Sequence, residues 1–129
     1  MQQRDRGIDV KNEPTHGIFD DGNTTIKLRS GSNQTSKYYR QNYIEENNVL
    51  KPPRELDISL GHVEGNAATI MRELNISEGA VIINHEEGPC YYCRTTVEDI
   101  LLEGQTLIVY WNDITGKTER IVLNGKASR

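Results

Sequence analysis

The sequence predicts an α/β fold in which helices pack on a mixed β-sheet. Five segments have the length and apolar pattern of strands, and two segments between the later strands show the periodicity of amphipathic helices. Connections that contain a helix favour parallel strands, whereas the short connections near both ends of the chain favour antiparallel hairpins. At 129 residues the chain fits one domain. We expect this domain to span residues 15–129, after a flexible polar leader or linker of residues 1–14.

The domain begins with a predicted hairpin. Residues 17–19 form a short apolar strand, residues 20–23 have turn chemistry, and residues 24–29 alternate like a return strand. This alternation indicates that the return strand buries one face.

The segment after the hairpin is less regular. Residues 37–48 have the pattern of a short helix, and Pro52 and Pro53 would end any helix. A structureless stretch of this length is unusual in a compact domain. Residues 30–60 therefore either carry a helix or form a functional loop.

The second half of the chain alternates between helices and strands. Residues 61–74 place their apolar side chains on one helical face, and a second helix is predicted over residues 90–102. Residues 79–84 form a continuous apolar run, which predicts a central strand buried on both faces. Residues 107–111 and 118–123 are predicted strands of a final hairpin, because no helix-length segment separates them.

Composition excludes several classes of protein. No run approaches the ~18 apolar residues of a membrane-spanning helix, no standard secretory signal opens the chain, and two cysteines are too few for a disulfide-dense scaffold. The net charge of −4 argues against a general basic surface for nucleic acid. One group of basic residues stands out, and we expect it to be a solvated hairpin edge: Lys27, Arg29, Lys37 and Arg40.

Chemistry-bearing residues gather at the starts of the two later helices. His62 and Glu64 open the first, and Cys90 and Cys93 open the second after Pro89. Cysteines three apart in a helix face the same way, which suits two ligands of one zinc ion. With His62 as the third ligand, the fourth zinc position stays open for water, as in catalytic sites. Glu64 would take a proton from the attacking water and pass it to the leaving group.

Other arrangements of these residues remain open. His62, His85, Cys90 and Cys93 would make a closed structural zinc site, although Glu64 then has no role. A non-enzymatic zinc-stabilised binding module and a redox Cys-x-x-Cys are further alternatives. His85 on its own is expected to be a loop residue beside the site.

An H-x-E motif followed by P-C-x-x-C resembles the signature of zinc nucleobase deaminases. The longer run over residues 61–93 resembles the DddA-like bacterial deaminase toxins, a branch of the cytidine-deaminase superfamily. Four features match. They are the GHVEG motif, the small residue Ala67 with the Met71-Arg72 pair later in the same helix, residues 76–79 just before the central strand, and Asn84. The match is looser over the first hairpin and the final strand pair. Residues 32–58 depart from the family's usual connection, and loops around a pocket select the form of the substrate.

The resemblance implies a three-layer cytidine-deaminase-like fold, with a five-stranded mixed sheet flanked by helices and an antiparallel last pair of strands. It implies one catalytic zinc ion held by His62, Cys90 and Cys93, with Glu64 as the acid/base. Val63 and Asn84 fall where the superfamily contacts the base and the sugar.

The implied activity is hydrolytic deamination of cytosine to uracil in DNA, with the duplex favoured. Single-stranded DNA, RNA and free nucleosides are the alternative substrates. The resemblance also implies the C-terminal domain of an interbacterial polymorphic toxin, delivered into the cytoplasm of a target bacterium. A cognate immunity protein would neutralise it in the producer, and we expect a monomer with no membrane partner.

Aromatic residues supply candidates for stacking on bases. Tyr91 and Tyr92 lie between the two cysteines, and one of them is expected to contact a flipped or flanking base while the other packs inward. Trp111 ends a predicted strand, where packing is favoured over base contact. A second candidate group, for which a plain amphipathic helix is the favoured alternative, comprises Tyr38, Tyr39 and Tyr43, interleaved with Lys37 and Arg40.

Overall fold

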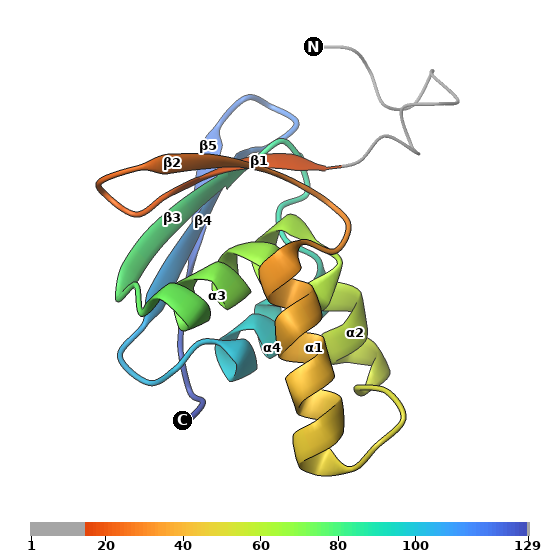
Figure 1. Ribbon diagram of the computed structural model, residues 1–129. Helices are drawn as coiled ribbons and strands as arrows, with labels where there is room; N and C mark the ends of the chain where they lie inside the picture. The colour runs from red at the N-terminus through yellow and green to blue at the C-terminus, as the bar shows by residue number, and fades with distance from the viewer. Residues whose placement is uncertain (1–14, 129) are drawn as a thin grey trace.

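Four helices lie on one side of a five-stranded sheet in the computed structural model, which describes residues 15–128 (Figure 1). The predicted leader, residues 1–14, lies outside the described residues. The strands are β1 (His16–Asp20), β2 (Thr25–Arg29), β3 (Glu78–Ile83), β4 (Thr106–Asn112) and β5 (Thr118–Asn124). The helices are α1 (Gln34–Asn47), α2 (Arg54–Leu60), α3 (Val63–Leu74) and α4 (Tyr91–Ile100).

The sheet is mixed, as the sequence predicts. Its strand order is β2-β1-β3-β4-β5. Strands β3 and β4 are parallel, and the remaining neighbours, including β4 and β5, are antiparallel. Strands β2 and β3 run in the same direction, as a helix-containing connection favours, but β1 lies between them.

The helices form two tiers over the sheet. Helices α3 and α4 contact the strands, whereas α1 and α2 pack on α3 and α4. The result is three layers, in the order sheet, α3 with α4, and α1 with α2 (Figure 1). Phe19, Met71, Leu107 and Leu123 are buried where the sheet meets the inner tier. None of the helices within residues 15–128 is long and apolar enough to cross a membrane.

One prediction about β3 is wrong. Its apolar run predicts burial on both faces, but only Val81 and Ile83 are buried, while Ile82 is 55% exposed. Successive side chains of a strand point to opposite faces, and the described helices all cover the same face. The run is apolar on both faces although only one of them is covered.

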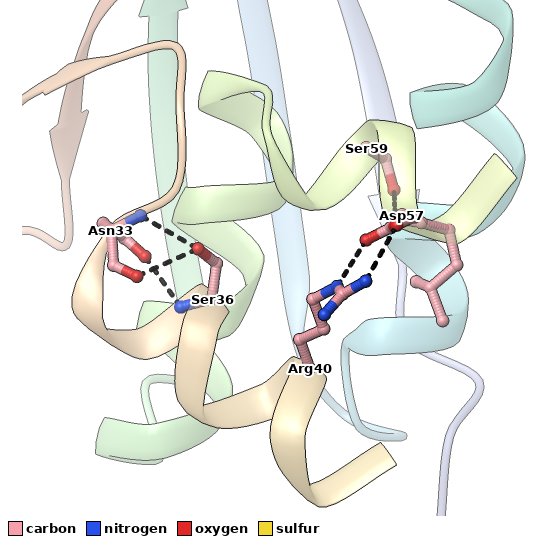
Figure 2. A network of polar contacts seen from close by, with 6 residues as sticks. Asn33, Ser36, Arg40, Asp57 and Ser59 are labelled. Carbon is pink, nitrogen blue, oxygen red and sulfur yellow. Dashed lines mark hydrogen bonds and ion pairs between the residues drawn. The ribbon is translucent and has the colours of Figure 1, made fainter. Parts of the chain in front are cut away.

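Helix α1 begins earlier than its apolar pattern indicates, because a capping box starts it. The Asn33 side chain accepts a hydrogen bond from the Ser36 backbone at 2.7 Å, and the Ser36 hydroxyl accepts one from the Asn33 backbone at 2.9 Å (Figure 2). Such reciprocal bonds satisfy backbone N–H groups that have no partner within the helix.

Helix α2 was not predicted. It begins directly after Pro53, and Glu55 and Asp57 lie in its first turn, where carboxylates favour the positive end of the helix dipole. Proline can end one helix and also start the next, and the sequence pattern at Pro53 indicates only the end of a helix. The Arg40 Nε atom lies 2.7 Å from the Asp57 Oδ1 atom, which joins α1 to α2 (Figure 2).

Candidate metal centre and catalytic pocket

The N-termini of α3 and α4 meet, and each supplies a donor residue. His62 is the N-cap of α3 with an extended backbone, and its imidazole makes no capping hydrogen bond. Cys90 is the N-cap of α4, and its sulfur accepts a hydrogen bond from the Cys93 backbone at 3.4 Å. Cys93 lies one turn into α4 and is fully buried.

The three donor atoms have the spacing of a metal site. The Nδ1 atom of His62 lies 3.2 Å from the Cys93 sulfur and 3.4 Å from the Cys90 sulfur. All three donors lie within 4.8 Å of one another. Tetrahedral zinc with ordinary bond lengths would place a nitrogen and a sulfur ligand about 3.6 Å apart. The cluster therefore fits zinc with a small expansion.

The donors perturb each other's protonation. A hydrogen bond with Cys93 lowers the pKa of Cys90 to about 4, and the bond with His62 contributes in the same direction. The same thiol–thiol bond, together with burial, raises the pKa of Cys93. A hydrogen bond with Cys90 raises the pKa of His62. The cluster thus stabilises a thiolate at Cys90, and a thiolate is the form that binds a metal.

Glu64 lies in the first turn of α3, beside the cluster. Only 4% of this residue is exposed, and burial raises the pKa of its carboxyl group. It lines a cavity of about 130 Å³ together with His62 and Cys90. A buried carboxyl group beside the donor cluster is placed to accept a proton and return it.

The rest of the cavity wall comes from two loops. Thr15 and Ser30 line it at the open end of the first hairpin, and His85 and Gly88 line it after β3. The Ser30 backbone donates to the Thr15 carbonyl at 2.8 Å, which holds the two hairpin residues together. Sequence reasoning missed both of them, because no local motif marks residues that only the sheet brings to the site.

Buried contacts fix the hairpin to the start of α3. The Asn66 side chain donates to the carbonyl of Gly31 at 2.8 Å, and the Gly31 backbone donates to the carbonyl of Gly61 at 2.6 Å. Gly65 allows α3 to approach α2, because a Cβ atom there would overlap the Ser59 carbonyl. The GHVEG motif therefore supplies packing as well as chemistry.

Trp111 has the packing role that the sequence favours. Its ring lies against Gly88, where a Cβ atom would come within 2.6 Å of the indole. The Arg94 guanidinium lies 5.7 Å from the ring, and Arg94 also donates to the Pro89 carbonyl at 3.0 Å. This packing holds the loop that leads into Cys90.

The predicted substrate residues take different positions. Val63 is fully buried beside Gly17 and does not line the cavity. Asn84 points to the other face of the sheet, and its side chain accepts a hydrogen bond from the His16 backbone at 2.9 Å. Their roles in substrate binding stay predictions.

The two tyrosines between the cysteines differ in exposure. Tyr91 is 72% exposed, whereas Tyr92 is half-buried. The Arg54 guanidinium donates to the Tyr92 hydroxyl at 3.1 Å and lies 5.8 Å from its ring. Neither tyrosine lines the cavity, and contact of either ring with a base stays a prediction.

Tyr39 and Tyr43 of the second tyrosine group pack against the core, whereas Tyr38 is 54% exposed. Tyr39 is half-buried with the Arg72 guanidinium 5.3 Å from its ring, and Tyr43 packs against the core. Arg40 is paired with Asp57. Arg72 lies two turns along α3 from Glu64, so these rings are at a distance from the cavity. This placement favours packing over base contact for Tyr39 and Tyr43.

The closed four-ligand zinc site finds no support. Within residues 15–128, the donor cluster consists of His62, Cys90 and Cys93, and His85 is not part of it. His85 lines the cavity instead, and its Nδ1 atom is buried with no hydrogen-bond partner. An open ligand position and a nearby buried carboxyl group are the arrangement of a catalytic metal site.

Comparison with known proteins agrees with this arrangement. A segment of 49 residues, 38% of this chain, is 45% identical to the double-stranded DNA deaminase toxin A of Burkholderia cenocepacia (strain H111). The segment covers only 3% of that relative's length. The family model of the SCP1.201-like deaminases matches residues 1–129. The chain therefore belongs to the SCP1.201-like deaminase family.

Proposed function

We propose that this chain is a zinc-dependent deaminase that converts cytosine to uracil in DNA, with duplex DNA as its favoured substrate. The observation that carries the proposal is the position of the His62 Nδ1 atom, 3.2 and 3.4 Å from the two sulfurs, in the same cavity as the buried Glu64. Family membership supports deamination, and the name of the partial relative favours duplex DNA.

The residues of the site have two roles, metal binding and proton transfer. His62, Cys90 and Cys93 would hold zinc, which when bound makes a water molecule nucleophilic at neutral pH. Glu64 takes a proton from this water as a C–O bond forms at C4 of cytosine. It then delivers a proton to the exocyclic amine as the C–N bond breaks. Cytosine and water thus give uracil and ammonia.

The size of the cavity supports a flipped base as substrate. Its volume of about 130 Å³ is below the roughly 300–1,000 Å³ of drug-sized ligand sites. A single pyrimidine ring fits this scale better than a stacked base pair. A deaminase that acts on duplex DNA must therefore extrude the target nucleotide.

The biological setting is part of the same proposal. The partial relative is named a toxin, which supports a role as the toxin domain of a longer interbacterial protein. Such a domain would act in the cytoplasm of a target bacterium and would be neutralised in the producer by an immunity protein. We propose that the domain works as a monomer.

A paired uracil-release assay tests the proposal. One cytosine-containing oligonucleotide is offered as a single strand and as a duplex, with Glu64→Ala as the inactive control. Product on the duplex that depends on Glu64 supports the proposal in full. Product on the single strand alone contradicts the duplex preference, and product only on RNA or nucleosides contradicts DNA as the substrate.

A further inference from the structure

The face of the sheet opposite the helices is apolar at its centre and uncovered within the described residues. Ile18 is 45% exposed, Ile82 55% and Val122 42%, although all three lie on interior or well-paired strand positions. Exposed apolar groups gathered on one face indicate a surface that contacts another molecule. We name the residues of this side the open face.

The register of the paired strands places Lys27 at the edge of the open face, next to its apolar centre. Lys27 pairs with Ile18, and Ile18 pairs with Ile82, so the three side chains form one row across β2, β1 and β3. Neighbouring strands lie about 4.8 Å apart, which puts Lys27 roughly 10 Å from Ile82 across the row. Arg29 lies two residues further along β2 on the same face.

This row borders a hollow of about 360 Å³. Ile18 and Ile82 form its apolar floor, and Lys27, His16 and Asn84 line it with polar groups. Asn84, expected from the sequence to contact substrate, thus lies in this hollow rather than in the cavity that holds Glu64.

The hollow and the catalytic cavity share one end of the sheet. Thr15 and Ser30 line the cavity, and the residues next to them, His16 and Arg29, belong to the open face. After β3, Asn84 lines the hollow while the following residue, His85, lines the cavity. A molecule that enters the cavity therefore has the hollow beside it.

Local charge favours a polyanion as the occupant. The chain carries a net charge of −4, yet Lys27 and Arg29 are both exposed and form no ion pair with any residue of 15–128. A cation above an apolar floor with an amide at its side fits a nucleotide, whose phosphate meets Lys27 while its base or sugar covers the isoleucines.

We propose that this hollow is a second nucleotide site, which binds a nucleotide flanking the target cytosine and contacts its phosphate through Lys27. The inference rests on the proposed function, since it takes the same DNA strand as its ligand. The proposal gives the first hairpin, which lies outside the catalytic motif, a role in substrate binding.

Binding measurements on an inactive background test this site without any need for turnover. Fluorescence anisotropy of a duplex oligonucleotide is followed against salt concentration for zinc-loaded Glu64→Gln alone and combined with Lys27→Gln. The control is Lys126→Gln, which removes the same charge after β5, at the opposite end of the sheet, where Lys126 pairs with Glu98.

We expect Lys27→Gln to make the plot of log affinity against log salt shallower by roughly 0.9, the value of one phosphate contact on duplex DNA, and Lys126→Gln to leave it unchanged. Ile82→Ser, at a 55% exposed position, should weaken binding with an unchanged salt slope. Equal slopes for Lys27→Gln and Lys126→Gln, or full affinity in Ile82→Ser, would overturn the proposal.

Shortening the DNA separates this inference from the proposed function. Removing the nucleotides on one side of the target should weaken DNA binding by Glu64→Gln more than DNA binding by the double variant with Lys27→Gln, which has already lost the phosphate contact. If the wild-type chain deaminates DNA but the Lys27→Gln and Ile82→Ser variants bind like the control, the proposal of a second nucleotide site is wrong and the proposed function stands. If the slopes differ but no cytosine is converted, the proposed function is wrong and the binding site stands.

Discussion

The Nδ1 atom of His62 lies 3.2 Å from the sulfur of Cys93, although the two residues belong to different helices. His62 is the N-cap of α3, and Cys93 lies in the first turn of α4. Two helix N-termini thus converge on one point, where their dipoles favour thiolates. The function of this donor cluster and the contacts that hold it in place can both be tested by substitution.

Glu64→Gln should abolish deamination while zinc stays bound. The amide keeps the size of the side chain but cannot accept the proton of the attacking water, and such proton transfer contributes roughly 10²–10⁴-fold to rate. Initial rates and zinc content by elemental analysis measure the two effects. Glu73→Gln is the matched control, because Glu73 is an exposed residue of the same helix. A variant that keeps its deamination rate would contradict the role of Glu64 in proton transfer.

Chelation should lower the melting temperature, and added zinc should restore it. A ligand that binds only the folded state stabilises it by about 2.7 kcal/mol at a hundred times its Kd. Differential scanning fluorimetry with and without a chelator measures this shift.

A histidine pair controls the zinc measurement. His62→Gln removes one donor of the cluster and should remove the response to zinc. His16→Gln changes an exposed imidazole outside the donor cluster and should leave the zinc response intact. An equal zinc shift in both variants would show that the metal binds elsewhere.

The donor set was predictable because its geometry is local. Cys90 and Cys93 are fixed by one helical turn, and His62 and Glu64 lie within two residues at the start of another. The spacing of such residues in the sequence therefore predicts which side chains lie together at one end of a helix. Thr15 and Ser30 reach the same cavity only because β1 inserts between β2 and β3, and no local pattern encodes that pairing.

Burial was harder to predict than strand position. The apolar run of β3 is the same whether helices cover one face or two, so Ile82 could not be distinguished from Val81. Helix α2 was missed for a different reason. Pro53 predicts the end of the preceding helix, although Glu55 and Asp57 after it form the acidic first turn of a new helix.

Gly65→Ala should destabilise the fold. A Cβ atom at this position would overlap the carbonyl of Ser59, so α3 would have to move away from α2, at a cost of about 1–3 kcal/mol. Gly61→Ala is the control, because its Cβ atom would lie 3.6 Å from the nearest atom. Urea unfolding measures both. Equal midpoints would show that the close approach of the two helices is not required.

Asn66→Ala should loosen the attachment of the first hairpin to the catalytic helix. Asn66 is 1% exposed, and its side-chain amide donates to the Gly31 carbonyl at 2.8 Å and the Arg29 carbonyl at 3.3 Å. Both hydrogen bonds are part-buried, and at about 0.5–1.5 kcal/mol each their loss should cost about 1–3 kcal/mol of unfolding free energy. Activity should fall as well, because Ser30, between those two carbonyls, lines the cavity.

Asn47→Ala is the control for Asn66→Ala, because it removes a side-chain amide that is exposed. The Asn47 side chain also donates to a backbone carbonyl, that of Tyr43 at 2.9 Å, but it lies on the exposed end of α1. Water replaces such a bond, so the change should stay within about 0.5 kcal/mol. Urea unfolding and initial deamination rates compare the two variants. A loss in Asn66→Ala no larger than in Asn47→Ala would mean that the hairpin is held by its backbone bonds, chiefly that from Gly31 to Gly61.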